Sequence, residues 1–312
     1  MLWLLSTLAL AQVPPAEPQW TPPAAAIAAV REVQARPVGE RIEAATRAFL
    51  GLPYLLDGTG EGVGIDPDPP ARYDRWDCMT LTEEALGMAL AGDPVEAATI
   101  RDALRYHGKP AYEERNHFME AEWIPRAIAA GLIEDITDRV GHARTLTHDV
   151  TLQTFHSWRH LRFFHLPDEL LPVGAWSLRY LDLAEAYDAA PRIPPGAIVV
   201  TLRVERTWAP VVTSHVSLAI PGKNGPMMRH ASKMGRQIVR DDKLDWYMEH
   251  LRDYVNWPAL GVTILLPREQ GPTLANTLPS VLPVLPLPDA TGDLPHFEPK
   301  PLIPFAAGDD PA

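Results

Sequence analysis

Cys78 is the one residue that could act as a thiol nucleophile, because this 312-residue sequence contains no other cysteine. Asp77 precedes it, and apolar residues recur behind it at helical spacing as far as Gly92. Aspartate is a preferred N-cap, so the pattern predicts that Cys78 lies in the first turn of a helix. The helix dipole lowers a thiol pKa there, and the thiolate is the nucleophilic form.

A lone cysteine is more often a small buried apolar residue than a nucleophile. Two observations favour the nucleophile here. The flanking residues 76–77 and 80–83 carry tryptophan, aspartate, threonine and glutamate, which is not a buried apolar run. An exported protein also usually avoids a free thiol that it does not use.

A nucleophilic thiol needs a base, and the base needs an orienting group. His215 and His230 are the best candidates, because each lies in a predicted strand and a turn separates the two strands. If the turn is the four residues 222–225, His230 opposes Ser217, which shares a face with His215. The two histidines would then be diagonal neighbours, whereas a slip of one residue would separate them. The alternative is two partly exposed strand histidines without a catalytic role.

Other patterns point less clearly to chemistry. His156 and His160 are four residues apart and would share one helix face, as metal ligands do, but the glutamate of a zinc-protease helix is missing. The glycines of 58–64 have the wrong spacing for a phosphate-binding loop. The sequence therefore predicts no resident metal and no cofactor, with a zinc hydrolase through the two histidines as an alternative.

Charge and composition exclude several classes of protein. The formal net charge is −12, so a general nucleic-acid binder is not expected, because phosphate binding needs a basic surface. A single cysteine excludes a disulfide framework and a cysteine-based zinc site within the chain. Hydrophobic residues make up 46%, which is ordinary for a globular protein with a sizeable core.

The two ends differ in composition from the middle. Residues 1–11 are an apolar run that ends in Ala-Leu-Ala, typical of a secretory cleavage site and too short to span a bilayer. We therefore expect export to the periplasm or the exterior, with no membrane segment after processing. Residues 12–39 read as a Pro/Ala-rich linker around one short helix. Residues 267–312 hold eleven of the 33 prolines and are predicted to be a disordered tail.

The periodic patterns lie in residues 40–266, which are predicted to form one domain. Helices come first and an antiparallel sheet second, which is an α+β plan. Residues 140–192 show no clear pattern and are predicted to be an insertion. The predicted helices are 41–50, 78–91, 95–106 and 117–130, the last broken near Pro125, and the predicted strands lie in 194–202, 214–220, 227–232 and 262–266.

Four stretches carry a family resemblance. They read FLGLPY (49–54), DCMTLTE (77–83), RNHFMEAEW (115–123), and SHV (214–216) followed by RHAS (229–232). They resemble the motifs FLGxPY, DCxTxxE, RNHYxxxDW, and SHVG with HAS of the N-acetylmuramoyl-L-alanine amidase-like branch of the NlpC-type cysteine hydrolases of bacterial cell walls. Each motif alone is weak, but all four in order are specific. Glu122 and Ser217 stand where that family commonly has aspartate and glycine.

The resemblance implies a papain-like, NlpC-type α+β fold. Its helical N-terminal half would place the nucleophile at a helix N-terminus, packed on an antiparallel sheet. By the same resemblance Cys78 is the nucleophile, His215 is the general base and acid, and His230 is the orienting residue.

Four further residues match family positions near the cleft. Tyr54 and Asp77 would lie beside it, and His117 and Glu120 would contact substrate at its rim.

The implied activity is hydrolysis of peptidoglycan amide bonds through an acyl-enzyme on Cys78. The expected substrate is a muropeptide or the wall itself, cut between the lactyl group of muramic acid and L-alanine. Cleavage between γ-D-glutamate and the diamino acid is an alternative within the same superfamily. A non-catalytic cell-wall-binding module, tethered by the proline-rich tail, is an alternative of another class.

Overall fold

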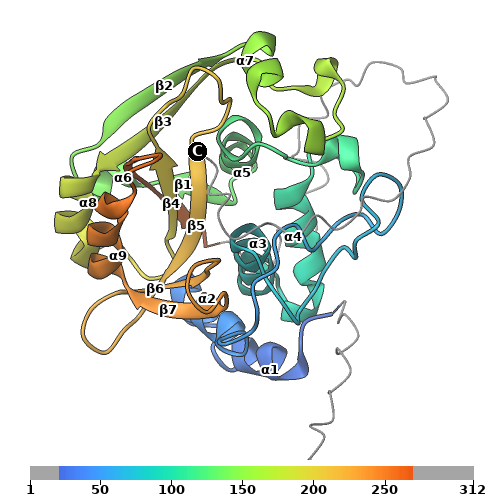
Figure 1. The fold of residues 1–312 in the computed structure, drawn as a ribbon. Helices are drawn as coiled ribbons and strands as arrows, with labels where there is room; N and C mark the ends of the chain where they lie inside the picture. The colour runs from blue at the N-terminus through green and yellow to red at the C-terminus, as the bar shows by residue number, and fades with distance from the viewer. Residues whose placement is uncertain (1–20, 270–312) are drawn as a thin grey trace, which may run out of the picture.

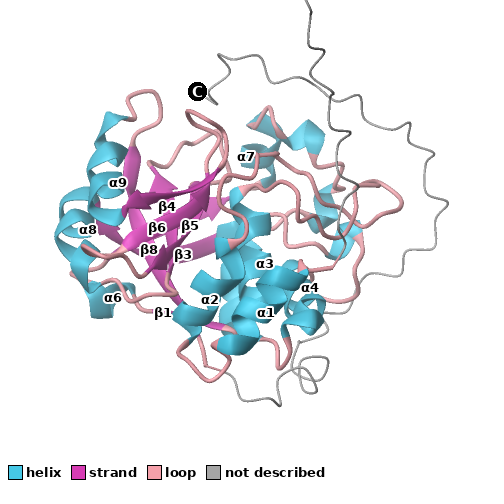
Figure 2. Cartoon of the chain, turned by 90° about the horizontal axis from the view of Figure 1, so that it is seen from below, coloured by secondary structure: helices cyan, strands magenta, loops and turns pink. Residues whose placement is uncertain are grey.

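The computed structural model describes residues 21–269, so the predicted signal segment 1–11 and nearly all of the predicted tail lie outside the described residues. One antiparallel sheet runs through the middle of the molecule, with helices on both of its faces (Figures 1 and 2). The predicted mixture of helices with an antiparallel sheet is confirmed.

The sheet has eight strands within the described part of the chain, and every neighbouring pair is antiparallel. The strand order is β2-β3-β8-β4-β5-β6-β7, with β1 paired to β8. The bounds are β1 Ile133–Asp135, β2 Arg144–Val150, β3 Gly174–Asp182, β4 Ile198–Arg203, β5 Thr213–Ile220, β6 Met227–Ala231, β7 Val239–Lys243 and β8 Ala259–Pro267.

Two groups of helices cover the two faces (Figure 2). The first group is α1 Ala24–Glu32, α2 Val38–Arg47, α3 Cys78–Leu90, α4 Ala97–Arg105 and α5 Ile124–Ala129. The second is α6 Thr137–Val140, α8 Leu183–Ala189 and α9 Leu244–His250, while α7, Leu152–Ser157, lies at the far end of the β2–β3 hairpin. Strand β4 joins the two cores by alternation: Ile198 and Val200 pack towards the first group, and Val199 packs towards the second.

The predicted helices exist, with shifted ends. Helix α2 begins at Val38, three residues before the expected start, and ends at Arg47. The chain then turns at Gly51, where the positive φ of +82° suits glycine. The predicted break near Pro125 is confirmed, because a π-helical turn, Met119–Trp123, precedes α5. Helix α1 lies within the predicted linker and packs its buried Ala26 and Val30 against the folded body.

Residues 140–192 extend the central sheet. They hold the β2–β3 hairpin, and β3 continues into the sheet by pairing Leu181 with Val262 of β8. Strand β7 and helix α9 were also missed by the sequence patterns. Strand β7 contains the charged residues Arg240 and Asp242. Charged residues are typical of an edge strand, but they hide the hydrophobic alternation by which a strand is recognised in the sequence.

Among residues 21–269, no helix is long and apolar enough to cross a membrane.

Candidate active site

Cys78 is the first residue of α3, as predicted, and its position is fixed by a reciprocal cap. The Asp77 carboxylate accepts a hydrogen bond from the Thr80 amide at 2.8 Å, and the Thr80 hydroxyl accepts one from the Asp77 amide at 3.0 Å. This capping box satisfies two amides that no helical carbonyl can reach. The local sequence Asp-Cys-Met-Thr therefore places the thiol at the start of a well-defined helix.

The sulfur of Cys78 lies among backbone amides. The backbone amides of Val216, Cys78 and Met79 are near enough to stabilise a thiolate and so to lower the thiol pKa. Val216 belongs to β5, against which α3 packs, and it follows His215 directly in sequence. The start of α3 thus meets the strand that carries the predicted base.

The expected low thiol pKa is wrong for this structure. Burial, followed by the charge of Asp77, raises the pKa of the Cys78 thiol to about 12, although the three amide donors oppose the shift. The main physical reason is that burial disfavours the charged thiolate, and the carboxylate that caps the helix also repels a thiolate next to it. The resting protein therefore holds a neutral thiol.

The predicted pairing of the two histidines is confirmed. Strands β5 and β6 pair Leu218 with Arg229, so the next step along the ladder sets His230 opposite Ser217. His215 lies diagonally across, and its Nε2 is 2.8 Å from Nδ1 of His230. The four-residue turn 222–225 fixes this register.

His215 is held neutral by its surroundings. Burial lowers its pKa well below the usual value, and the neighbouring His230 adds to the effect. Three cations act in the same direction, namely Arg203, Lys233 and Arg240. A neutral imidazole is the form that can accept a proton from a thiol.

Asp242 extends this histidine pair and was not found from the sequence. His230 Nε2 is 3.0 Å from Oδ2 of Asp242, and Arg240 forms an ion pair with the same oxygen at 2.9 Å. Burial works against ionisation, but His230 and Arg240 hold the pKa of the Asp242 carboxyl below its usual range. We call His215, His230 and Asp242 the histidine network. The signal that could have found Asp242 is its alternation with Arg240 in a strand next to His230.

Tyr54 is near enough to Cys78 and Asp77 to be influenced by their charges, and its place beside the cleft stays a prediction. Its amide donates to the Gln237 carbonyl, and it bridges to Trp76, two residues before Cys78. Burial and the charges of Cys78 and Asp77 raise the pKa of its phenol, which therefore remains a hydrogen-bond donor at neutral pH.

The side chains of Glu120 and His117 form hydrogen bonds with other groups of the protein. Glu120 is 3% exposed, and its carboxylate accepts from the amides of Val212 and Thr213 and from the Thr213 hydroxyl. It thereby anchors the start of β5, two residues before His215. His117 donates from Nε2 to the Tyr112 carbonyl at 2.8 Å, and its ring lies tilted against the Tyr112 ring. Substrate contact by these two residues stays a prediction.

A second polar network lies between α3 and α4, and we call it the ion-pair network. Glu83 binds Arg105 at 2.7 Å and accepts from the Trp123 indole at 3.2 Å. Glu84 binds Arg101 at 3.1 Å and accepts from the Tyr73 hydroxyl. All four charged side chains are at most 6% exposed, so these buried ion pairs connect α3 firmly to α4.

The zinc alternative through His156 and His160 finds no support. Helix α7 ends at Ser157, so the two histidines do not share a helix face, and His156 instead pairs with Asp168 at 2.9 Å. Within residues 21–269 no group of three or more histidine, cysteine or acidic side chains is placed to hold a metal ion.

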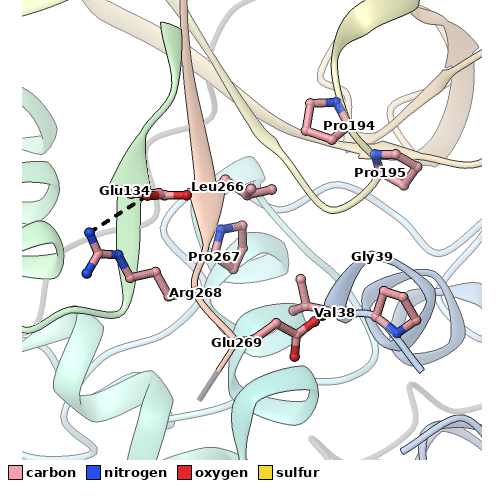
Figure 3. Close-up of a pocket in the computed structure, with 10 residues that line it drawn as sticks. Val38, Gly39, Glu134, Pro194, Pro195, Leu266, Pro267, Arg268 and Glu269 are labelled. Carbon is pink, nitrogen blue, oxygen red and sulfur yellow. Dashed lines mark hydrogen bonds and ion pairs between the residues drawn. The ribbon is translucent and has the colours of Figure 1, made fainter. Parts of the chain in front are cut away.

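A hollow of about 470 Å³ lies near the start of β4. Figure 3 shows the residues that line it. Its walls come from the start of α2, the end of β8 and the prolines before β4. Its acidic groups already have partners: Glu134 pairs with Arg268, and Glu269 pairs with Arg41. His215 pairs with Thr201 near the opposite end of β4, so this hollow is not part of the thiol site.

Comparison with known proteins gives a family and a fold. The model of a family described as N-acetylmuramoyl-L-alanine amidase-like matches residues 44–252, about two thirds of the chain. No curated protein sequence matches.

Several solved structures are similar at low sequence identity, which shows the fold alone. A Legionella pneumophila protein of the DUF1460 family has a TM-score of 0.68 at 21% identity, over 78% of this chain and 93% of that one. An N-acetylmuramoyl-L-alanine amidase from Bacteroides uniformis has a TM-score of 0.62 at 22% identity, over 74% of this chain and 99% of that one. A proposed xylanase from Bacteroides fragilis has a TM-score of 0.57 at 24% identity, over 70% and 98%.

Proposed function

The chain belongs to the N-acetylmuramoyl-L-alanine amidase-like family, and we propose that it is a cysteine amidase that cuts peptidoglycan between the lactyl group of muramic acid and L-alanine. The observation that carries the proposal is the thiol of Cys78 at a capped helix start, beside the strand that carries the His215–His230 pair. We further propose that the fold is of the papain-like, NlpC type, because that class sets its nucleophile and base on the same two kinds of element.

The first chemical step joins proton transfer to attack. The resting thiol is neutral, so its proton passes to His215 as the Cys78 sulfur forms a bond to the substrate carbonyl carbon. The carbonyl oxygen becomes an oxyanion, and amides at the start of α3 are suited to hold it. A raised thiol pKa therefore makes His215 necessary, since little thiolate exists without it.

The later steps return the enzyme to its starting state. Protonated His215 gives its proton to the leaving nitrogen of L-alanine, the C–N bond breaks, and a thioester remains on Cys78. Water, deprotonated by His215, then attacks the thioester and releases the muramic acid carboxylate. The proton gained from water restores the Cys78 thiol.

The charge around His215 fits an anionic peptide. Arg203, Lys233 and Arg240 act on His215, although the whole chain has a formal net charge of −12. Stem peptides carry free carboxylates, which such cations attract. We expect Lys233→Glu to raise KM for muropeptides while kcat changes little, because Lys233 is exposed.

Two other functions are separated by their products. A γ-D-glutamyl-diamino acid endopeptidase would use the same residues but release a fragment that contains L-Ala-D-Glu. A binding module would retain muropeptides without cutting them, and it would have no use for the paired histidines. We also propose that the protein acts outside the cytoplasm, with residues 1–11 as its export signal. N-terminal sequencing of the protein recovered from cell fractions tests this.

The central experiment is mass spectrometry of defined muropeptides incubated with the protein and with Cys78→Ala. We expect a free peptide that begins with L-alanine from the wild type only. Lys223→Ala, an exposed residue of the β5–β6 turn, is the matched control and should cut normally. Intact muropeptides in every reaction would contradict the proposal, and L-Ala-D-Glu fragments would move the cut to the neighbouring bond.

A further inference from the structure

Three adjacent strands place three titratable side chains in one diagonal row. His215 on β5 is two residues from Ser217, the residue opposite His230 on β6. Asp242 on β7 is likewise two residues from Arg240, the residue opposite His230. Because side chains alternate between faces with a period of two, all three point to the same side of the sheet. The row ends at Asp242, on the edge strand of this side of the sheet.

With one proton on His230, the hydrogen bonds along the row permit one arrangement of protons. An ionised carboxylate only accepts, so His230 must donate to Asp242 from Nε2. A neutral His230 then has its lone pair on Nδ1, which accepts from Nε2–H of His215. The lone pair of His215 is left on Nδ1, the ring nitrogen that the pair with His230 does not use.

We propose that Asp242 is a positioning residue that sets the proton-accepting atom of His215, acting through His230 over two hydrogen bonds. This rests on the proposed function, in which His215 takes the thiol proton. Asp242 touches neither the thiol nor the reacting atoms. Its effect is to select the Nε2–H tautomer of both histidines and so to keep Nδ1 of His215 available for the proton of Cys78.

Arg240 supports the same assignment. It forms an ion pair at 2.9 Å with the oxygen of Asp242 that also lies 3.0 Å from His230 Nε2. This keeps the carboxylate ionised and fixes which oxygen faces His230. Without an acceptor at that position, His230 could carry its proton on Nδ1 and donate to His215. His215 would then hold its own proton on Nδ1 and could not accept another.

During the reaction the protons in the two hydrogen bonds among His215, His230 and Asp242 stay on the same nitrogen atoms. When Nδ1 of His215 receives the thiol proton, the imidazolium still donates from Nε2 to His230, and His230 still donates to Asp242. The carboxylate stabilises the positive charge without being protonated, as the acidic member of a serine-protease triad does.

The test compares two variants of one side chain. Asp242→Asn keeps an oxygen that can accept from His230, whereas Asp242→Leu has the same branched shape, is larger and has no acceptor. We expect Asp242→Leu to lower kcat about 100-fold with KM unchanged, and Asp242→Asn to lower it less. Asp245→Ala, an exposed acid three residues further on, is the matched control and should retain wild-type kcat.

The second readout is the tautomer itself, measured by ¹⁵N NMR of protein labelled in histidine. Signals are assigned with His215→Gln and His230→Gln. We expect the Nε2–H tautomer for both histidines in the wild type and in Asp242→Asn, and a shift of His215 towards Nδ1–H in Asp242→Leu. If Asp242→Leu does not fold, Asp242→Ala carries the same test.

This readout needs no substrate, so it separates the two proposals. A wild type that cuts no muropeptide but shows the expected tautomers would contradict the proposed function and support the role of Asp242 in the row. An unchanged His215 tautomer in Asp242→Leu, or an unchanged kcat, would overturn the inference.

Discussion

Two polar networks contact the thiol-bearing helix α3, and they differ in how their charged groups are paired. In the ion-pair network every buried charge faces an opposite charge across α3 and α4, as Glu83 does with Arg105. In the histidine network burial favours the neutral form of His215, the Asp242 carboxylate is stabilised at the far end, and one ring nitrogen of His215 takes no part in the pair with His230. The first network can only hold the helix, whereas the second can move a proton. Stability and chemistry are thus assigned to opposite sides of one helix.

The sharpest test of this division is His215→Gln. We expect kcat to fall by about 10²- to 10⁴-fold, because the acceptor of the thiol proton is lost. The free energy of unfolding should change by only about 1 kcal/mol, since the substitution leaves α3 and its cap untouched. Muropeptide assays and urea unfolding measure the two quantities on the same preparation. Activity within tenfold of the wild type would contradict the role of His215 as the acceptor of the thiol proton.

The matching test on the other network is Glu83→Ala. It leaves Arg105 buried without its partner, so we expect the free energy of unfolding to fall by about 3–5 kcal/mol. Glu96→Ala, which removes an exposed acid next to the same pair of helices, should change it by about 0.5 kcal/mol or less. Chemical denaturation of both variants provides the measurement. Equal losses for the two would show that the ion-pair network does not hold α3.

Glu122 gives a pH-dependent test of the structural side. Burial raises the pKa of its carboxyl to about 7, although the Phe118 amide and Arg126 oppose the shift. The folded state therefore binds a proton that the unfolded state releases above about pH 4.5, and this stability is lost as pH rises towards 7.

Glu122→Gln does not titrate. Relative to wild type, we expect it to gain about 2 kcal/mol of stability between pH 5 and pH 8. Thermal unfolding across that range checks the sign. A difference between the two proteins that stays constant with pH would contradict it.

The smallest expected effect is at the helix cap, where the two roles meet. Asparagine caps a helix as well as aspartate does, so Asp77→Asn should leave stability within about 0.5 kcal/mol. It removes the charge that helps to raise the Cys78 pKa, so the pH midpoint of alkylation by iodoacetamide should move down. Glu96→Gln should leave that midpoint unchanged. A midpoint in Asp77→Asn that is equal to or above the wild-type value would show that Asp77 does not act on the thiol.

Local patterns determined much of this protein in advance. The N-cap before Cys78, the four-residue turn after β5 and the alternation in β4 each act over a few residues, so the sequence predicted the helix start, the His215–His230 register and the inner strands. The four motifs also indicate the N-acetylmuramoyl-L-alanine amidase-like family, to which the chain belongs. The region 140–192 could not be predicted, because β3 pairs with β8, which is far away in the chain. Strand β7 could not be predicted either, because its charged residues hide the alternation of a strand, although its partner β6 directly precedes it.

The tertiary structure alone decided the state of the protons. From the sequence, the helix dipole argues for a thiolate at Cys78, but burial and the neighbouring carboxylate reverse that in the folded protein. Asp242 becomes part of the histidine network only because β7 lies against β6, and Glu83 becomes a structural charge only because α4 brings Arg105 to it. Residue types and short spacings fix which chemical groups the chain has. The distances between strands and helices, and the exclusion of water around them, fix which of those groups are charged.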